Sequence, residues 1–375
     1  MKIKRGVKRL LSLIPKSFFN FLIRLTNNRI YDKKLDNDVL TSFQKDEGKS
    51  CIKKDQASII NKYDLQIVVP CYNIQKFGKR CINSIVNQKT KYSFCLILVN
   101  DGSTDKTEEI LNQYISENVK VINKKNGGSS SARNKGLETI SAKYLMFVDS
   151  DDYLLNENVV ENMLSIVDGV DNKGKNIIVE FSYINSSFKR IKEPKKTVVE
   201  KCKSIDFTGF GWGKIYSSAL FKQVEFPESY WFEDTVLHTI IYPMADECYK
   251  SNALSYFYQL NDSGMTSQSK FSNKTLDTFY VTRSLLKDRR QLGLKDDDSF
   301  YFRFFYQTIC NCNRLLKFPE DIQLAVFYET IKIFEIYNIK MIKGFKTLFL
   351  SLKERKFKQY ISFCKYYSMI YLNLD

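Results

Sequence analysis

The chain has 375 residues, of which 43% are hydrophobic and 14% aromatic, and this composition excludes a largely disordered protein. Lysine and arginine number 58 against 42 aspartates and glutamates, so the net charge of +16 favours an anionic partner: nucleotide phosphates, nucleic acid or an acidic membrane surface. The nine cysteines show no CxxC spacing and there is one histidine, so we expect reduced thiols in a cytosolic protein and no zinc site.

Residues 1–62 are predicted to form a basic N-terminal extension. The first 31 residues contain eight lysines and arginines and no acid. This pattern fits a helix on an anionic lipid surface, and equally a helix packed on the protein body with a solvated basic face. The apolar stretch 9–26 is interrupted by Pro15, Lys16 and Arg24, so we expect neither a signal peptide nor a membrane-spanning helix.

Residues 63–185 alternate between predicted strands and helices. Apolar runs predict strands at 65–69, 94–99, 119–123, 144–148 and 177–183. Helical spacing or capping predicts helices at 78–88, after Asp105, at 132–140 and at 156–167. Continuous apolar strands between helices are typical of a mainly parallel sheet with helices on both faces. In such α/β sheets, ligands bind beyond the carboxyl ends of the strands.

The rest of the chain divides into a mixed region and a helical one. Residues 63–268 are predicted to be one catalytic domain, with a nucleotide-binding half at 63–153 and an acceptor half at 154–268. Residues 269–375 are predicted to be a helical C-terminal region, in which an aromatic face at 300–309 fits a core. With 19 basic and 11 acidic residues from 270 onward, it favours contact with an anionic membrane. The alternatives to a membrane contact are, in order, an oligomer contact and a nucleic-acid-binding surface.

Polar or turn-forming residues follow each of the first four strands. They are Pro70, Tyr72 and Asn73; Asp101 and Asp105; Gly127, Gly128 and Arg133; and Asp149, Ser150, Asp151 and Asp152. In a parallel sheet these groups share one edge and suit a nucleoside diphosphate with a divalent metal. An aromatic ring can pack on the base, glycine amides can approach phosphate, and Mg²⁺ or Mn²⁺ can separate two carboxylates that would otherwise repel. Each group taken alone is more often an ordinary turn or helix cap.

The order of these motifs, within residues 65–153, resembles that of the family 2 glycosyltransferases with the GT-A fold. The stretches that carry the resemblance are IVVPCYN (67–73), VNDGSTD (99–105), ARN (132–134) and FVDSDD (147–152). Members of that family transfer a sugar from a nucleoside diphosphate, most often UDP, to an acceptor hydroxyl with inversion. The resemblance implies roles for matching residues. Pro70, Tyr72, Asn73 and Asp101 would hold the nucleoside, Asp105, Gly128 and Arg133 the nucleotide and its diphosphate, and Asp149, Ser150 and Asp151 the DxD site.

In the DxD site, Asp151 is expected to be the direct metal ligand, with Asp149 beside it and Asp152 as a supporting acid. The family's later acidic pair corresponds to Glu233 and Asp234, and inversion needs a base that takes the acceptor's proton. We assign that role to Asp234, although acids at these positions could simply begin a helix at 235–244.

Two further residues stay open at this point. His238 would share a helical face with Asp234 and could touch acceptor or diphosphate, but a lone histidine is more often a packed surface residue. Trp212 could stack on a sugar or belong to the core.

Taken together, the sequence predicts a metal-dependent, inverting hexosyl- or N-acetylhexosaminyltransferase that uses a UDP-sugar. Its acceptor would be a surface glycan or lipid-linked saccharide at the cytoplasmic face of the plasma membrane, where the enzyme would sit peripherally. No nucleic acid is expected as a partner, and a homo-oligomer is an open alternative. The rival functions are a sugar-nucleotide nucleotidyltransferase and a non-catalytic membrane- or nucleic-acid-binding protein on a transferase core.

Overall fold

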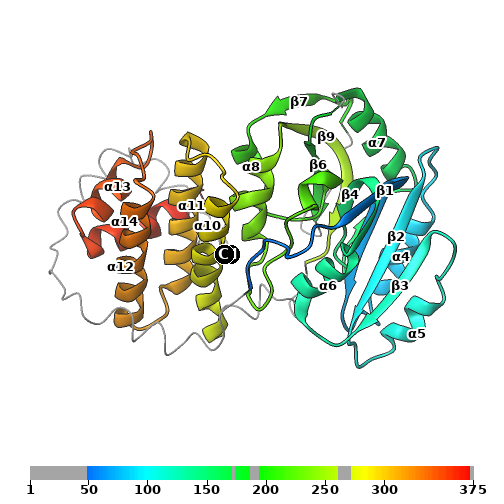
Figure 1. The fold of residues 1–375 in the computed structure, drawn as a ribbon, viewed down its shortest axis with the longest axis horizontal. Helices are drawn as coiled ribbons and strands as arrows, with labels where there is room; N and C mark the ends of the chain where they lie inside the picture. The colour runs from blue at the N-terminus through cyan, green and yellow to red at the C-terminus, as the bar shows by residue number, and fades with distance from the viewer. Residues whose placement is uncertain (1–48, 171–173, 186–193, 261–271, 372–375) are drawn as a thin grey trace. The chain divides into compact units, whose positions relative to one another are not determined.

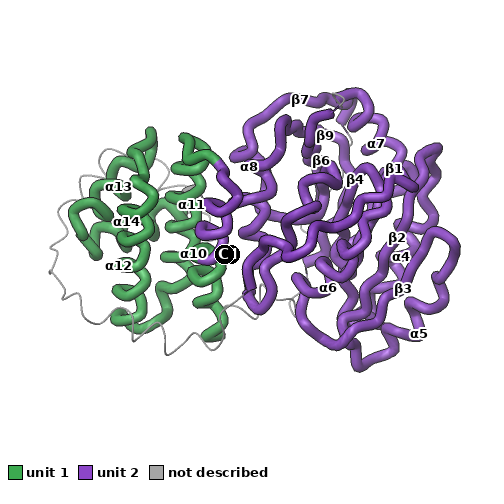
Figure 2. The backbone as a smooth tube through the Cα atoms, in the orientation of Figure 1, with its two compact units in different colours: residues 1–47, 269–283, 295–375 green, residues 48–268, 284–294 purple. Residues whose placement is uncertain are grey.

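The computed structural model describes residues 49–170, 174–185, 194–260 and 272–371. These residues divide into two compact units (Figure 2). One unit contains the sheet and comprises the described parts of 48–268 together with 284–294. The other unit is helical and comprises the described parts of 269–283 and 295–375. The predicted N-terminal extension at 1–62 lies largely outside the described residues.

The sheet unit is built on nine strands in the order β3-β2-β1-β4-β8-β6-β9-β5, with β7 paired to β9 (Figure 1). The strands are β1 (Ser58–Cys71), β2 (Phe94–Asp101), β3 (Val119–Lys124), β4 (Thr139–Phe147), β5 (Tyr153–Leu154), β6 (Ile177–Asn185), β7 (Val199–Cys202), β8 (Lys214–Ser217) and β9 (Glu247–Tyr258). Strands β1 to β4 pair in parallel, β8 is antiparallel to both β4 and β6, and β6 is parallel to β9. Strands β5 and β7 are antiparallel to β9, so the sheet is mixed, and the predicted parallel pairing is confirmed for β1 to β4.

Helices cover both faces of this sheet, and β1 is therefore buried on both sides. Leu65, Ile67 and Val69 point into a core that also contains apolar residues of α4 (Gly78–Val86) and α7 (Val159–Val170). Val68 points the opposite way, towards α6 (Gly128–Gly136). A Cβ atom on Gly136 would lie 2.5 Å from Val68 Cγ1, so the glycine allows α6 to pack directly on the strand. The short helix α5 (Thr107–Asn112) connects β2 and β3.

One predicted helix was too long. The helix expected at 132–140 ends at Gly136, and Thr139 and Ile140 belong to β4. The reason is that β1 begins seven residues before the predicted strand. Its early residues Ser58 and Ile59 pair with Thr139 and Ile140, and this backbone pairing extends β4 towards its N-terminus.

The helical unit contains α11 (Asp298–Leu315), α12 (Glu320–Ile336), α13 (Lys346–Lys353), α14 (Phe357–Tyr371) and the first part of α10 (Asp277–Gln291). The aromatic face predicted at 300–309 is buried, with Phe305 and Ile309 fully enclosed. The second part of α10 belongs to the sheet unit. There Asp288 accepts hydrogen bonds from the Ser50 hydroxyl and from the Cys51 amide. No helix in the described ranges combines the length and apolar character needed to span a membrane.

Candidate active site

The carboxyl ends of β1, β2 and β4 lie at one edge of the sheet because the three strands are parallel and in close register. Pro70 of β1 is paired with Val99 of β2, and Val68 is paired with Phe147 of β4. Asp101 at the end of β2 and Asp149 just beyond β4 therefore lie on either side of β1. Two strand spacings separate their strands, which is about 10 Å.

Asp101 is almost fully buried and its carboxylate is occupied by this chain's own groups. Lys124 Nζ lies 2.6 Å from Oδ1, the Gly127 amide donates to Oδ1 at 3.0 Å, and the Gly128 amide donates to Oδ2 at 2.7 Å. Asp101 therefore ties the N-terminus of α6 to the end of β2. The two glycine amides predicted to approach phosphate are engaged by this carboxylate.

Two glycines make the tight approach of these loops feasible. Gly102 has φ +69°, and a Cβ atom there would lie 2.6 Å from the Asn126 backbone nitrogen. Gly128 has φ +86°, a conformation that other residues rarely adopt. The sequence at both positions therefore fits the geometry that the loops require.

The loop after β1 places one exposed ring at this edge. Tyr72 is 51% exposed, whereas Pro70, two residues before it, is half-buried in the strand. Asn73 has φ +52° and its side chain accepts a hydrogen bond from the Thr104 amide, which joins the loops after β1 and β2. Asp105 accepts hydrogen bonds from the amides of Thr107 and Gln75, and these bonds hold its pKa below the ordinary value despite the opposing effect of burial.

Arg133, on α6, joins acidic residues that are distant in the sequence. Its guanidinium is only 6% exposed. Nη2 donates to Asp149 Oδ1 at 3.0 Å and Nη1 donates to Glu233 Oε1 at 2.8 Å. Nη1 also lies 3.9 Å from Asp234 Oδ1. The structure thus brings together four residues that the sequence singled out separately, and it sets one buried cation among three carboxylates.

Tyr256 of β9 holds the acidic loop that follows β4 (Asp149–Asp152) in place through hydrogen bonds. The Asp149 amide donates to the Tyr256 hydroxyl at 3.0 Å, and that hydroxyl donates to Asp152 Oδ2 at 2.7 Å. Asp152 is fully buried and also accepts a hydrogen bond from the Gln259 amide. Burial and the neighbouring Asp149 raise the pKa of Asp152 to about 8. Asp152 therefore supports the loop, while Asp149, Ser150 and Asp151 are partly exposed.

Glu233 and Asp234 follow a strained residue and precede a helix with an irregular turn. Phe232 has φ +64°, which is costly for a bulky side chain. The helix predicted at 235–244 is present, but residues Leu237–Ile241 form a π-helical turn before α8 (Tyr242–Met244). Such turns are frequent at functional sites. Glu233 is buried and accepts hydrogen bonds from Arg133 and Ser129, whereas the Asp234 side chain is 37% exposed.

Asp234 is the carboxylate of this group that suits proton transfer. Its Oδ1 atom has no hydrogen-bond partner within the described part of the chain. Burial of that oxygen raises the pKa of Asp234 to about 7, assisted by Glu233 and Asp149 and opposed by Arg133 and Lys214. A carboxyl group with a pKa near neutrality can both take up and release a proton at physiological pH.

Trp212 belongs to an aromatic stack in the core of the sheet unit. Its ring lies parallel to Tyr256, with centroids 4.6 Å apart, and parallel to Phe210 at 4.5 Å. It is 5% exposed, so most of its faces are covered by protein. His238 packs edge-on against Tyr242 at 4.9 Å, and a Cβ atom on Gly209 would lie 3.3 Å from its Nε2. Trp212 is therefore a core residue, and His238 lies between Tyr242 and the backbone at Gly209.

The residues present fit a divalent ion that also takes ligands from a bound phosphate. The described residues include no group of three or more histidine, cysteine or acidic side chains that could hold a metal unaided. Asp149 and Asp151 are a pair of partly exposed carboxylates at the mouth of the site. Mg²⁺ and Mn²⁺ are commonly bound by one or two carboxylates together with substrate phosphates. This donor set is compatible with the predicted ion.

Sequence reasoning missed Tyr256 and the ion group formed by the buried Glu180 and Lys214 with the partly exposed Lys250. Glu180 Oε1 lies 2.8 Å from Lys214 Nζ and Oε2 lies 3.1 Å from Lys250 Nζ. A signal for Glu180 was present, because it is the single acid within the apolar run at 177–181. Nothing comparable marked Tyr256, since tyrosine is frequent throughout this chain.

The comparisons with known proteins agree with this geometry. Residues 66–221 match the family model described as glycosyl transferase family 2. These residues form a family 2 glycosyltransferase domain. The matched span includes every strand-end residue described above, and it ends before Glu233 and Asp234.

Relatives of this chain include named glycosyltransferases and a teichoic acid biosynthesis protein. Glycosyltransferase GlyA of Streptococcus pneumoniae is 27% identical over 218 residues, which are 54% of this chain and 31% of GlyA. The minor teichoic acid biosynthesis protein GgaB of Bacillus subtilis is 41% identical over 110 residues, 28% of this chain and 12% of GgaB. The aligned part therefore spans a third or less of each of these relatives.

A solved structure extends the likeness in fold. S. aureus TarS, residues 1–349, crystallised with UDP-GlcNAc, superposes with a TM-score of 0.62 at 21% identity. The superposition covers 81% of this chain and 91% of that one. The predicted GT-A fold, a parallel-sheet domain with a helical region after it, is thereby confirmed.

Proposed function

We propose that this protein is an inverting glycosyltransferase that moves a sugar from a nucleoside diphosphate to an acceptor hydroxyl, with Asp234 as the general base. The observation that carries the proposal is the Arg133 bridge. It holds Asp149, at the end of a nucleotide-binding strand, and Glu233, next to the proposed base, on one guanidinium. A donor diphosphate beside Asp149 and an acceptor beside Asp234 would then meet in one place.

The donor nucleoside would lie on the exposed Tyr72 ring, against the loops after β1 and β2. Asn73, Asp101 and Asp105 would act mainly by shaping these loops, because their side chains bond to other loop residues. Asp101 would keep Gly128 and the start of α6 next to the diphosphate. Pro70 and Ser150 would contribute contacts at the end of β1 and in the acidic loop.

Asp149 and Asp151 would hold the divalent ion, Mn²⁺ or Mg²⁺, with Asp151 as the direct ligand. The bound ion would neutralise charge on the diphosphate leaving group. Asp152 would hold the acidic loop in place through Tyr256. Arg133 would add a fixed positive charge behind Asp149 and hold the Glu233 carboxyl group next to Asp234.

In the reaction, the acceptor oxygen would attack the anomeric carbon as the bond from that carbon to the diphosphate oxygen breaks. The acceptor's proton would pass to an oxygen of Asp234. Inversion follows because attack and departure take place on opposite faces of the sugar. The raised pKa of Asp234 suits this transfer, since a base with a pKa near 7 is both available and effective at neutral pH.

A nucleotide-sugar panel tests the proposal. UDP-glucose, UDP-GlcNAc and GDP-mannose would each be incubated with the full chain and Mn²⁺, and the released phosphates identified. A glycosyltransferase releases nucleoside diphosphate, through slow hydrolysis of the donor where no acceptor is present. In a parallel incubation with UTP and a sugar 1-phosphate in place of the nucleotide sugar, release of pyrophosphate would instead indicate a nucleotidyltransferase. The TarS complex with UDP-GlcNAc makes that donor the first to try.

We also propose a peripheral contact with an anionic membrane, which would suit a lipid-linked or growing surface glycan as acceptor. The supporting segment runs from the last residue of α12 to the first residue of α13 in the helical unit. Ile336 is 59% exposed and Met341 is 53% exposed. Lys340, Lys343 and Lys346 are exposed among them, and the sequence from 336 to 353 contains no acid. Apolar tips flanked by lysines favour the boundary between headgroups and acyl chains.

A further inference from the structure

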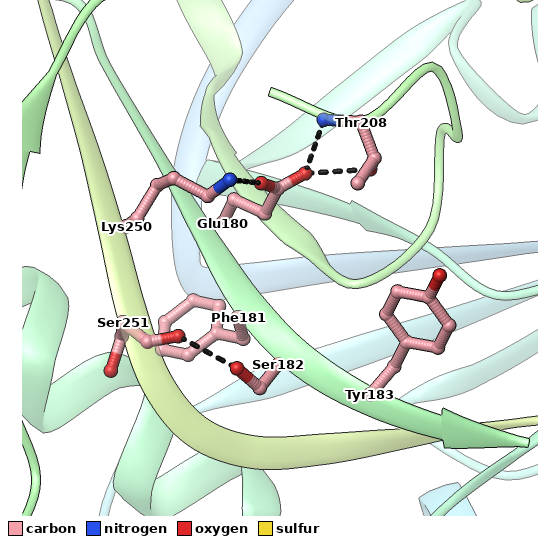
Figure 3. Close-up of a pocket in the computed structure, with 7 residues that line it drawn as sticks. All are labelled: Glu180, Phe181, Ser182, Tyr183, Thr208, Lys250 and Ser251. Atoms are coloured by element: carbon pink, nitrogen blue, oxygen red, sulfur yellow. Dashed lines mark hydrogen bonds and ion pairs between the residues drawn. The ribbon is translucent and has the colours of Figure 1, made fainter. Parts of the chain in front are cut away.

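A small pocket opens on the sheet unit between β6, β9 and the segment after η2 (Ser204–Asp206) (Figure 3). Its volume is about 180 Å³. It is lined by Glu180, Phe181, Ser182, Tyr183, Thr208, Lys250 and Ser251. The proposed donor and metal residues are absent from this lining.

The charges of the pocket are arranged around Glu180. Its Oε1 atom accepts hydrogen bonds from the Thr208 amide at 2.8 Å and hydroxyl at 2.6 Å, and lies 2.8 Å from the fully buried Lys214 ammonium. Burial alone would raise the pKa of Glu180, but these contacts outweigh it and the pKa lies below the ordinary value. Glu180 is therefore a stable carboxylate in a partly enclosed site.

One carboxylate oxygen of Glu180 and one ammonium hydrogen of Lys250 can still form hydrogen bonds with a ligand. Glu180 Oε2 has a single partner among the described residues, Lys250 Nζ at 3.1 Å. Lys250 Nζ also donates to the Asp206 carbonyl at 2.8 Å, and an ammonium group has three hydrogens to donate. The Lys250 side chain is 43% exposed. An acceptor next to a donor matches a hydroxyl group, which donates to one and accepts from the other.

The pocket lies close to the proposed base along the chain. Thr208 forms part of its wall, and a Cβ atom on Gly211 would lie 3.7 Å from Asp234 Oδ1. Three residues span at most about 11 Å. The Tyr183 ring also packs edge-on against Trp212, with centroids 4.8 Å apart, and Trp212 stacks on Tyr256 beneath the acidic loop. The chain from Thr208 to Gly211 therefore limits the separation between the pocket wall and Asp234 Oδ1 to at most about 15 Å, a range that one or two linked sugar units can span.

We infer that this pocket is an acceptor subsite that binds the hydroxyl groups of a neutral sugar or polyol unit, one or two units away from the hydroxyl that Asp234 would deprotonate. The term "acceptor" in this inference rests on the proposed function. The binding of a polyhydroxyl unit in the pocket does not depend on that function. Glu180 Oε2 and Lys250 Nζ recognise adjacent hydroxyls, and the Tyr183 ring offers an apolar face with a polar tip. Because Glu180 is balanced by two lysines, the unit needs no charge of its own.

The test is ligand-observed saturation-transfer NMR on the full chain, without donor or metal. The probes are glycerol, ribitol, methyl glucoside, N-acetylglucosamine and the phosphate esters of glycerol and ribitol. We expect at least one neutral probe to bind, with affinity reduced about tenfold in Lys250→Met, the loss typical of a hydrogen bond to a charged group. Tyr183→Phe should weaken binding of the neutral probe less than Lys250→Met does, because the aromatic ring remains.

Lys201→Met is the matched control, because Lys201 is an exposed lysine of the adjacent strand that pairs with Glu247 outside the pocket. It should bind the neutral probe as the unaltered chain does. Equal binding by Lys250→Met, no binding of any neutral probe, or binding of the phosphate esters alone would each overturn the inference. Metal-dependent UDP binding, measured separately, reports on the proposed function, so either idea can fail without the other.

Discussion

Arg133 Nη1 lies 2.8 Å from Glu233 Oε1, although 100 positions separate the two residues in the chain. Since the same guanidinium also bonds to Asp149, the contact joins the sheet edge to the segment that carries Asp234. Arg133 and Glu233 are both buried, so removal of the cation would leave the Glu233 carboxyl group with little access to water, beside the partly exposed Asp149 and Asp234.

Replacing this arginine should therefore destabilise the fold. Arg133→Gln is expected to lower the free energy of unfolding by about 3–5 kcal/mol, the range seen when one partner of a buried ion pair is removed. Burial already raises the pKa of Asp149 against the opposing effect of Arg133, so without the cation the folded-state pKa of Asp149 should rise further above its unfolded value. The loss should then be smaller at pH 5 than at pH 8, because protonation relieves the repulsion. Denaturant unfolding at pH 5 and pH 8 measures the loss in the free energy of unfolding at each pH.

Arg355→Gln is the control for that experiment, since Arg355 forms an exposed ion pair with Glu335. Such pairs contribute about 0–1 kcal/mol. If Arg133→Gln changed stability no more than Arg355→Gln, the bridge would not have the structural role assigned to it.

Asp234→Asn should separate binding from transfer. The amide keeps the size of the side chain but cannot accept the acceptor's proton at neutral pH. We expect the affinity for the donor nucleotide to stay within about twofold, and turnover to fall about 10²- to 10⁴-fold, the usual contribution of general base catalysis. Calorimetry and a nucleoside diphosphate release assay measure the two quantities. Turnover close to that of the unaltered chain would exclude Asp234 as the base.

The pH dependence of turnover should follow the protonation of Asp234. A base must be deprotonated, and the pKa of Asp234 is raised to about 7, so turnover should fall about tenfold per pH unit below that value and level off above it. A pH profile at saturating donor and acceptor measures this fall. Turnover that is flat from pH 8 to pH 5 would contradict the assignment.

Charge reversal in the helical unit tests the membrane contact. Changing Lys340, Lys343 and Lys346 together to glutamate should reduce binding to phosphatidylglycerol vesicles by on the order of 100-fold, since each lysine near an anionic surface contributes about 1 kcal/mol. Lys89→Glu, on the sheet unit, is the control for a general loss of positive charge. Vesicle co-sedimentation at low and moderate salt measures both. Unchanged binding by the triple variant would place any membrane contact elsewhere.

The sequence predicted the parallel half of the sheet well because β1, β2 and β4 contain continuous apolar runs, which are buried on both faces. Strands β5, β7, β8 and β9 were not predicted; β5, β7 and β8 have only two to four residues, which carry little signal, and β9 lies in the region for which the sequence predicted no strands. The strand-end residues could be listed in advance, since they follow directly from where the apolar runs stop.

What the sequence could not predict was how those residues are used within the fold. Asp101 was expected to face a ligand, yet its carboxylate binds Lys124 and two glycine amides. The contact between Arg133 and Glu233 depends on packing between segments far apart in the chain. Lys214 reads as a surface residue in the sequence, but it is fully buried because Glu180 lies opposite it on the neighbouring strand.

Calorimetric titration of UDP, with and without Mn²⁺, into the unaltered chain and Asp151→Ala tests the central claim most directly. Glu157→Gln serves as the control, because Glu157 is an exposed acid outside the site. The account predicts that Mn²⁺ strengthens UDP binding in the unaltered chain and in Glu157→Gln, and that Asp151→Ala loses this strengthening. Metal-independent binding of UDP, or an Asp151→Ala variant that still responds fully to Mn²⁺, would contradict it.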